Sequence, residues 1–300
     1  MGALNGRVVI VTGGGRGLGR AHCLELARQG ATVVVNDLGV TLGGESETHE
    51  VSPAEQVVEE LSALGTTAVA DHTSVTDWSG MEGLVRRTVE QFGDLHAVVN
   101  NAGFIRDRSL TAMGEEEFDA VIAVHLKGTF TVTRHACAYW RDRAKAGASV
   151  SGRVVTTTSG AGLFGNFGQA NYGSAKAGIA MLTRIVALEM QRYGVTANCL
   201  SPIAATRMLA TTGRRAVAGE GWDPLDPANA SPVVAWLCTE ESGWLSGSVL
   251  RVDGNTVSRV SGWAVEPGGY RSASGEALTF DELSVGVRRL FGAAPIGLGG

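Results

Sequence analysis

Residues 8–19 read V-V-I-V-T-G-G-G-R-G-L-G and decide the fold. The apolar run Val8–Val11 predicts a buried parallel strand, and Leu18–Gln29 has the composition of a helix that ends at Gly30. A strand, a glycine-rich turn and a helix in this order are typical of a site for the diphosphate of a dinucleotide, because glycines let an anion approach the free N–H groups at the helix N-terminus. The glycines expected to do so are Gly13, Gly17 and Gly19.

The next expected strand, Thr32–Asn36, runs into Asp37, about 20 residues beyond the glycines. A carboxylate at this position hydrogen-bonds the hydroxyl groups of an adenosine ribose and repels a phosphate on its 2′ oxygen. Asp37 therefore favours NAD over NADP as cofactor. Arg16, in the glycine turn, favours NADP, but more weakly, because a surface arginine can face solvent instead.

Apolar runs and helical segments alternate along the rest of the chain. The expected strands are 8–11, 32–36, 67–70, 95–99, 153–157, 195–199 and 248–252. The expected helices are 18–29, 53–64, 77–92, 115–143, 171–192 and 232–238. This alternation predicts an α/β fold, a doubly wound parallel sheet of about seven strands with helices on both faces. Polar and glycine residues follow several of the strands, and parallel strands share one C-terminal edge, so we expect one site at that edge.

Residues 156–176, T-T-T-S-G-A-G-L-F-G-N-F-G-Q-A-N-Y-G-S-A-K, hold Ser159 after a strand and Tyr172 and Lys176 four residues apart. In a helix the last two side chains leave the same face. A free tyrosine has a pKa of about 10, and an ammonium fixed beside it lowers that pKa, which lets the phenol act as a base. A Y-x-x-x-K pattern is common on its own, so the assignment depends on the glycine motif upstream.

Composition excludes several classes of function. The chain has 300 residues and a net charge of −5, and its basic residues are scattered, which argues against nucleic acid or an anionic membrane as partner. No apolar run reaches the roughly 18 residues that a membrane helix needs. The four cysteines, Cys23, Cys137, Cys199 and Cys238, are far apart and form no C-x-x-C pair, so we expect no metal site and buried free thiols in a reducing, cytoplasmic compartment.

Three segments lie outside the regular alternation. Residues 38–52 form a long polar insertion, expected at the surface, and 201–230 could cover a substrate as a lid. After residue 254 the chain first has an irregular pattern. Thr279 and Glu282 then match a capping box, and apolar residues at helical spacing follow it: Phe280, Leu283, Val287, Leu290 and Phe291. We therefore expect one domain, 1–254, with an extension, 255–300, whose short amphipathic helix packs on the same domain.

Together, T-G-x-x-x-G-x-G at 12–19, N-N-A-G at 100–103, Ser159 and Y-x-x-x-K at 172–176 resemble the short-chain dehydrogenase/reductase family. Within that family, V-V-V-N-D-L-G at 33–39, V-H-L-K-G at 124–128 and G-N-F-G-Q-A-N-Y at 165–172 are similar to the (3R)-hydroxyacyl-CoA dehydrogenase module of peroxisomal multifunctional enzyme type 2. The resemblance implies a Rossmann-type sheet and an NAD-dependent enzyme that interconverts a secondary alcohol and a ketone, most closely (3R)-hydroxyacyl-CoA and 3-oxoacyl-CoA.

The resemblance also implies roles for individual residues. The catalytic residues would be Ser159, Tyr172, Lys176 and His125. The cofactor-binding residues would be Thr12, Gly13, Arg16, Gly17, Leu18, Gly19, Asp37, Ser74, Val75, Asn101, Ala102, Gly103, Tyr172, Lys176, Ile203 and Thr206. His125 stands where many members of the family have an asparagine that holds a water in a proton relay. S-P-I at 201–203 replaces the family's usual P-G pair beside the nicotinamide.

A coenzyme A thioester needs cations for its phosphates, and the candidates are Arg106, Arg108, Arg207, Arg214 and Arg215. Other activities stay open at this point: a steroid or other secondary-alcohol dehydrogenase, an NADPH-dependent 3-oxoacyl carrier-protein reductase, or a cofactor-binding protein without catalysis. The helices 115–143 and 171–192 resemble those that form interfaces in the family, which implies a homodimer or homotetramer.

Overall fold

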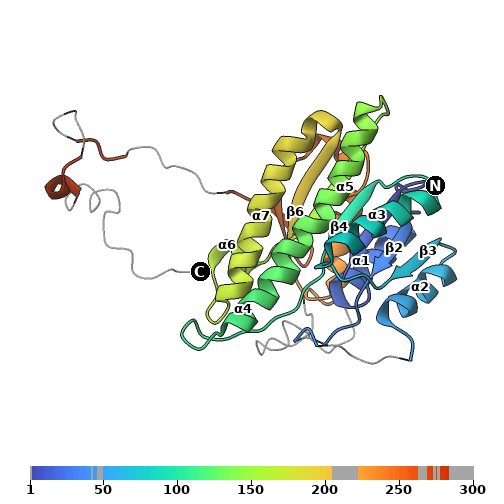
Figure 1. Cartoon of the computed structure of the whole chain (residues 1–300), viewed down its shortest axis with the longest axis horizontal. Helices are drawn as coiled ribbons and strands as arrows, with labels where there is room; N and C mark the ends of the chain where they lie inside the picture. Colours follow the sequence, from blue (N-terminus) through green and yellow to red (C-terminus); the bar gives the residue numbers. More distant parts are fainter. Residues whose placement is uncertain are drawn as a thin grey trace. The chain divides into compact units, whose positions relative to one another are not determined.

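The computed structural model describes residues 2–41, 43–45, 50–204, 222–262, 269–272, 275 and 278–283. The chain divides into two compact units, Met1–Val260 and Ser261–Gly300. The first unit contains the sheet and the helices around it (Figure 1).

The first unit is built on one sheet, which has eight strands in the described part of the chain. These are β1 (Val8–Thr12), β2 (Thr32–Asn36), β3 (Ala68–Asp71), β4 (Ala97–Asn100), β5 (Gly152–Thr157), β6 (Val195–Ile203), β7 (Val249–Asp253) and β8 (Thr256–Val260). Their order is β3-β2-β1-β4-β5-β6-β7-β8, and the first seven are parallel. The predicted doubly wound α/β sheet is therefore confirmed.

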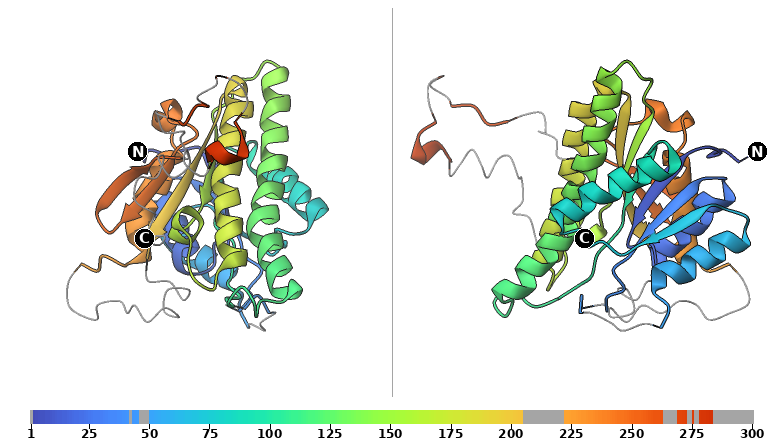
Figure 2. Two further views of the ribbon diagram at one scale, coloured as in Figure 1. Left: turned by 90° about the vertical axis from the view of Figure 1, so that its left-hand side faces the viewer. Right: turned by 45° about the vertical axis from the view of Figure 1, so that its right-hand side comes forward.

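Helices cover both faces of the sheet, as Figure 2 shows. One face carries α1 (Gly17–Arg28), α2 (Pro53–Ala63) and α9 (Ser231–Leu237), and the other carries α3 (Trp78–Phe92), α5 (Gly128–Lys145) and α7 (Ala170–Met190). Strand residues alternate between the two cores: Val9 and Val11 pack with the first group, and Ile10 packs with the second. Such strands are apolar throughout because both of their sides are buried.

Local signals set the helix ends where the sequence predicts them. Ser52 caps α2 in a capping box: its hydroxyl accepts from the Glu55 N–H at 3.2 Å, and the Glu55 carboxylate accepts from the Ser52 N–H at 2.9 Å. The Asp77 carboxylate caps α3 by accepting from the Gly80 N–H at 3.0 Å. Gly93 ends α3 with a φ of 83°, a left-handed conformation that glycine adopts without strain.

The edge of the sheet differs from the prediction. Residues 256–260, expected to be irregular, form β8, which pairs antiparallel with β7. Gly254 and Asn255 make the two-residue turn between the strands, and Gly254 has a φ of 53°. A two-residue glycine–asparagine turn before β-branched residues is a hairpin signal, and it explains why this unit extends to Val260 rather than to residue 254.

Two helical features also differ. The expected single helix 115–143 is α4 (Glu115–Ile122), a π-helical turn η1 (Ala123–Lys127) and α5. A short helix, α6 (Gly160–Phe164), follows Ser159, where no helix was expected. A Cβ on Gly162 would lie 2.6 Å from the Ala177 backbone nitrogen, so the close approach of α6 to α7 requires glycine there.

The second unit is described only in part. Residues 280–283 are helical, and Thr279 and Glu282 form the predicted capping box, with the Glu282 carboxylate accepting from the Thr279 N–H at 2.9 Å. The remainder of the predicted helix, including Val287, Leu290 and Phe291, lies outside the described residues. That this segment packs on the first unit stays a prediction.

The four cysteines are unpaired, which confirms the predicted free thiols. Cys23, Cys199 and Cys238 are buried, and Cys137 is half-buried. Burial raises the pKa of all four thiols, to about 12 for Cys137 and Cys238.

Candidate active site

The glycine turn lies at the C-terminal end of β1, where the strand order reverses between β1 and β4. Open α/β sheets bind ligands at such a switch point. Gly13 has a φ of 63°, and a Cβ on it would lie 2.7 Å from the Ala102 Cα. A Cβ on Gly19 would overlap the Gly13 carbonyl oxygen. The turn therefore has no space for side chains, as an approaching diphosphate requires.

The N-N-A-G segment is fastened to this turn. The Thr12 hydroxyl accepts from the N–H groups of Asn101 and Ala102 at 3.1 and 3.2 Å. The Asn101 side-chain amide donates to the Gly13 carbonyl oxygen at 3.1 Å. Thr12 and Asn101 thus hold the ends of β1 and β4 in register beneath the site.

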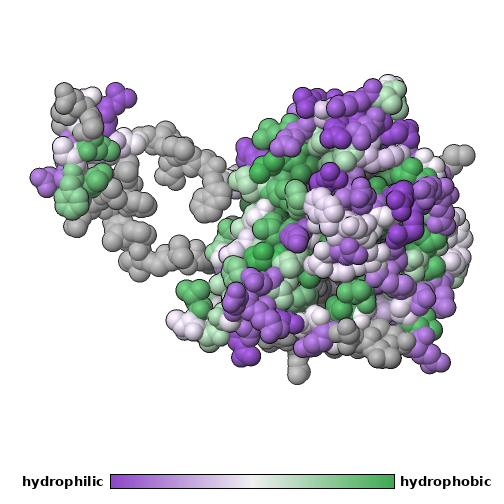
Figure 3. Space-filling model, in the orientation of Figure 1, coloured by the Kyte–Doolittle hydropathy of each residue, from purple (hydrophilic) through white to green (hydrophobic). Residues whose placement is uncertain are grey.

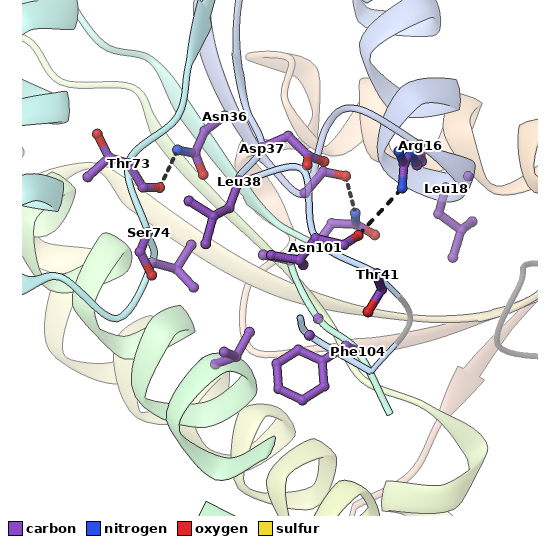
Figure 4. A pocket seen from close by; sticks show the side chains of 18 residues that line it. Arg16, Leu18, Asn36, Asp37, Leu38, Thr41, Thr73, Ser74, Asn101 and Phe104 are labelled. Atoms are coloured by element: carbon purple, nitrogen blue, oxygen red, sulfur yellow. Dashed lines mark hydrogen bonds between the residues drawn. The ribbon is translucent and has the colours of Figure 1, made fainter. Parts of the chain in front are cut away.

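A cavity of about 190 Å³ opens beside the turn (Figure 4). Ten of the residues predicted to bind cofactor line it: Gly13, Arg16, Gly17, Leu18, Asp37, Ser74, Val75, Asn101, Ala102 and Gly103. Thr12 and Gly19 do not line the cavity but contact Asn101, which does. Ile203 lies at the end of β6. Thr206 lies outside the described residues.

Asp37 follows β2 and lines this cavity. Its carboxylate accepts from the Gly15 N–H and from the Gly39 N–H, both at 2.8 Å. These bonds fix the carboxylate at the mouth of the glycine turn, and Figure 4 shows Asp37 among the side chains that line the cavity. The Arg16 guanidinium donates to the Val40 carbonyl oxygen at 3.4 Å, so this arginine faces the insertion.

Several residues that line the cavity were not predicted: Asn36, Leu38, Val40, Thr41, Gly44, Thr73, Phe104 and Val124. The Asn36 amide donates to the Asp71 carboxylate and to the Thr73 carbonyl oxygen, both at 2.8 Å, and so connects β2 to the segment after β3. A polar residue that ends a buried apolar strand was the available signal for Asn36. The residues between 38 and 44 belong to the insertion, for which the sequence carried no such signal.

The predicted catalytic residues lie together at the start of α7 and the end of β5. The Lys176 Nζ is buried, donates to the Thr157 carbonyl oxygen at 2.7 Å and lies 5.6 Å from the centroid of the Tyr172 ring. The Thr158 hydroxyl donates to the Lys176 carbonyl oxygen at 2.7 Å. Ser159 caps α6, and its hydroxyl accepts from the Ala161 N–H at 3.3 Å.

Burial dominates the electrostatics of these groups. It raises the pKa of Tyr172, while a hydrogen bond with Ser159 acts to lower that pKa. It lowers the pKa of Lys176 to about 8. The net pKa of Tyr172 is therefore raised, not lowered as the sequence predicted, because loss of hydration outweighs the favourable hydrogen bond with Ser159.

His125 lies in the π-helical turn, fully buried, with its ring edge-on to Tyr172 at a centroid distance of 5.2 Å. Its Nε2 lies 2.7 Å from the carbonyl oxygen and 3.1 Å from the nitrogen of Phe104, contacts that need opposite tautomers. The shorter contact favours an Nε2–H that donates to the oxygen. Burial, with a smaller effect of Lys176, lowers the His125 pKa to about 3, so the ring is neutral.

Asn171 was not predicted as part of the site. It is completely buried, its amide donates to the carbonyl oxygens of Arg106 and Glu117 at 2.9 and 3.1 Å, and its own oxygen accepts from the Tyr172 N–H at 2.7 Å. It therefore ties the start of α7 to two other segments. Its place directly before Tyr172 was the only sequence signal.

The proposed thioester arginines are only partly described. Arg106 donates to the Glu116 carboxylate at 3.1 Å, and Arg108 lies 3.6 Å from the Glu117 carboxylate. Arg207, Arg214 and Arg215 lie outside the described residues. Within the part of the chain that the structure describes, no three His, Cys, Asp or Glu side chains gather as a metal ion would require, and no helix is long and apolar enough to cross a membrane.

Comparison with known proteins identifies the family of this chain. A family model described as short chain dehydrogenase matches residues 7–216. The hydroxyacyl-CoA dehydrogenase ChsB1 of Mycobacterium tuberculosis is 43% identical over 294 residues, which cover 96% of this chain and 89% of that protein. The peroxisomal multifunctional enzyme type 2 of Mus musculus is 41% identical over 244 residues, 80% of this chain and 31% of that longer protein.

A solved structure is similar throughout. The crystal structure of a short chain dehydrogenase from Mycobacterium avium matches with a TM-score of 0.86 and 49% identity, over 97% of this chain and 96% of that one. Members of this family use NAD or NADP, and the glycine turn fits such a group. The chain belongs to the short-chain dehydrogenase/reductase family and is an oxidoreductase that acts on CH–OH groups.

Proposed function

We propose that this protein is an NAD-dependent dehydrogenase that converts (3R)-hydroxyacyl-CoA to 3-oxoacyl-CoA. The observation that carries the proposal is the near-complete alignment with the mycobacterial hydroxyacyl-CoA dehydrogenase, together with the grouping of Ser159, Tyr172 and Lys176.

The choice of NAD is supported by the mouth of the cavity. The Asp37 carboxylate is fixed there by two backbone N–H groups, so hydroxyl groups of an adenosine ribose can donate to it. A 2′-phosphate would approach the same carboxylate and be repelled. Arg16, the cation that could offset this repulsion, donates to Val40 in the insertion.

The chain's own residues supply binding and proton transfer. A bound nicotinamide supplies the acceptor for the hydride. The Ser159 hydroxyl and the Tyr172 phenol share one hydrogen bond and so can hold a substrate oxygen between them. Tyr172 then removes the hydroxyl proton as general base, and Lys176, anchored on Thr157, favours the phenolate that accepts it.

The neighbouring side chains keep this phenol in place. Asn171 fixes the backbone of Tyr172, and the neutral His125 packs against the edge of its ring. His125 is held by Phe104, so it positions the phenol and does not itself carry a charge near neutral pH.

The first test is formation of reduced cofactor from (3R)- and (3S)-hydroxyacyl-CoA of several chain lengths, each with NAD and with NADP. We expect turnover with the (3R) series and NAD. Activity with steroid alcohols and none with any thioester would overturn the substrate, and faster turnover with NADP would overturn the cofactor assignment.

Tyr172→Phe tests the mechanism. Loss of the phenol should reduce kcat by about 10²–10⁴, the usual contribution of general acid–base catalysis. Binding of NAD, measured by calorimetry, should remain. Turnover close to that of the wild type would show that another group accepts the proton.

A further inference from the structure

The insertion after Asp37 forms one wall of the cofactor cavity. Leu38, Val40, Thr41 and Gly44 line it, together with residues that follow β4. A surface insertion without function would not need to face the cavity. What holds these residues in place therefore bears on how tightly the cavity binds its ligand.

The turn of the insertion is closed by its own hydrogen bonds. The Thr41 hydroxyl accepts from the N–H groups of Gly43 and Glu45, both at 3.2 Å, and donates to the Glu45 carboxylate at 2.7 Å. The Thr41 N–H donates to the Glu45 carbonyl oxygen at 2.9 Å. These bonds give the turn one shape before any ligand arrives.

Arg106 connects this turn to helix α4 and to Phe104. Its Nε donates to the Gly43 carbonyl oxygen at 2.8 Å, and its Nη1 donates to the Glu116 carboxylate at 3.1 Å. The guanidinium carbon lies 5.6 Å from the centroid of the Phe104 ring. One side chain thus contacts the insertion, the first turn of α4 and the aromatic ring that lines the cavity.

Gly44 packs directly against the ring of Phe104, with no space for a side chain between them. A Cβ on Gly44 would lie 2.8 Å from the Phe104 ring, and Gly44 has a φ of 84°. The ring itself is buried, and its backbone is held by His125. Only glycine therefore lets the turn rest on the ring, and a side chain there would lift the turn away from the cavity.

We propose that Arg106 is a positioning residue that clamps Gly43 and Gly44 against Phe104, and that this clamp determines the affinity for the dinucleotide. This inference rests on the proposed function, since it takes the cavity as the cofactor site. The proposal gives Arg106 a role in cofactor binding and not in binding the phosphates of a thioester, because the guanidinium of Arg106 donates to Gly43 and Glu116.

The test compares Arg106→Ala with Arg86→Ala. Arg86, on α3, also pairs with a glutamate, Glu90 at 3.7 Å, but does not line the cavity. Calorimetry with NAD alone should give a Kd about tenfold higher for Arg106→Ala, the scale expected for loss of a hydrogen bond from a charged donor. Arg86→Ala should bind as the wild type does. Arg106→Lys, which can still donate to Gly43, should recover part of the affinity.

Kinetics separate this role from thioester binding. In Arg106→Ala the KM for NAD should rise while kcat at saturating NAD stays close to the wild-type value. The KM for a hydroxyacyl-CoA should change no more than that for a hydroxyacyl pantetheine thioester, which has no nucleotide phosphates. A rise in KM for the coenzyme A thioester alone, with unchanged NAD binding, would overturn the proposal.

Gly44→Ala gives an independent check, because it leaves the guanidinium in place. We expect the same loss of NAD affinity, with a modest fall in melting temperature, because alanine is strained at this φ. Unchanged NAD binding in this variant or in Arg106→Ala would overturn the clamp. If the wild-type protein binds neither NAD nor NADP, the proposed function is overturned as well.

Discussion

Burial moves the pKa values of Tyr172 and Lys176 in opposite directions. The pKa of the phenol rises above its usual 10.0, and that of the ammonium falls from 10.5 to about 8. The active pair, a phenolate beside an ammonium, is therefore scarce at neutral pH. Its population is largest between the two pKa values.

The rate of alcohol oxidation should therefore depend on pH in a bell shape with its maximum above pH 8. On the acid side the phenol keeps its proton, and on the alkaline side Lys176 loses its charge. The profile of kcat/KM for NAD reports the enzyme free of cofactor and is the quantity to measure. A maximum below pH 7 would contradict the assignment of these two groups.

Asn171 offers a second test at the level of single residues. Asn171→Ala removes the support of the Tyr172 backbone and the amide hydrogen bonds to the part-buried carbonyl oxygens of Arg106 and Glu117, which should lower the free energy of unfolding by about 1–3 kcal/mol. We expect kcat to fall while the Kd for NAD stays constant. Asn171→Asp keeps the acceptor for the Tyr172 N–H but loses the amide that donates to Arg106 and Glu117. It therefore separates support of the Tyr172 backbone from the connection to the other two segments.

At the level of elements, the π-helical turn places a histidine where it cannot take up a proton. Burial lowers the pKa of His125 to about 3 and that of His22 to about 4, from 6.5. In the unfolded chain both rings are protonated below pH 6.5, so acid favours unfolding. The free energy of unfolding should fall as pH drops from 6.5 towards 4.

Denaturant titrations at a series of pH values check this expectation. In this range the slope of the free energy of unfolding against pH should correspond to up to about one proton for each buried histidine. His125→Asn should show a shallower slope, because it removes the share of His125 and leaves those of His22, His96 and His135, whose pKa values burial also lowers. An unchanged slope in His125→Asn would mean that the ring is already protonated in the folded protein.

Elements with strong local signals were predicted well. The seven parallel strands are apolar runs between helices, and α2 and α3 have caps within their own sequence. The elements missed, β8 and α6, are five residues each. The signal for β8, the two-residue turn at Gly254 and Asn255, was present in the sequence, whereas α6 depends on its close packing against α7, which the local sequence does not show.

At the level of the whole molecule, the predicted convergence of the glycine turn, Asp37 and the N-N-A-G segment is confirmed by their place around one cavity. It was predictable because parallel strands all end at the same edge. The part of the cavity wall that the insertion after Asp37 forms was not predictable. Contacts such as Arg106 with Gly43 join segments 63 residues apart, and no periodicity or cap records them.

Assembly is a prediction for the molecule as a whole. Met181, Ile185 and Leu188 are exposed on one side of α7, and Figure 3 shows apolar side chains gathered over this helix. We expect a dimer or tetramer that uses this surface, as measured by light scattering. Ile185→Glu with Leu188→Glu should reduce the mass of the assembly.

Leu64→Glu is the matched control, since Leu64 is an exposed leucine at the end of α2, away from α7. It should leave the mass of the assembly unchanged. A wild-type mass equal to that of one chain would contradict the expectation.

The four cysteines have a practical consequence for experiments in solution. Alkylating reagents attack the thiolate, and all four native thiols have a raised pKa; three of them are buried, and Cys137 is half-buried. A cysteine introduced at an exposed position, such as Leu64, would therefore react with a maleimide dye long before the native four. Fluorescent probes can thus be attached to chosen sites of this enzyme without first removing any cysteine.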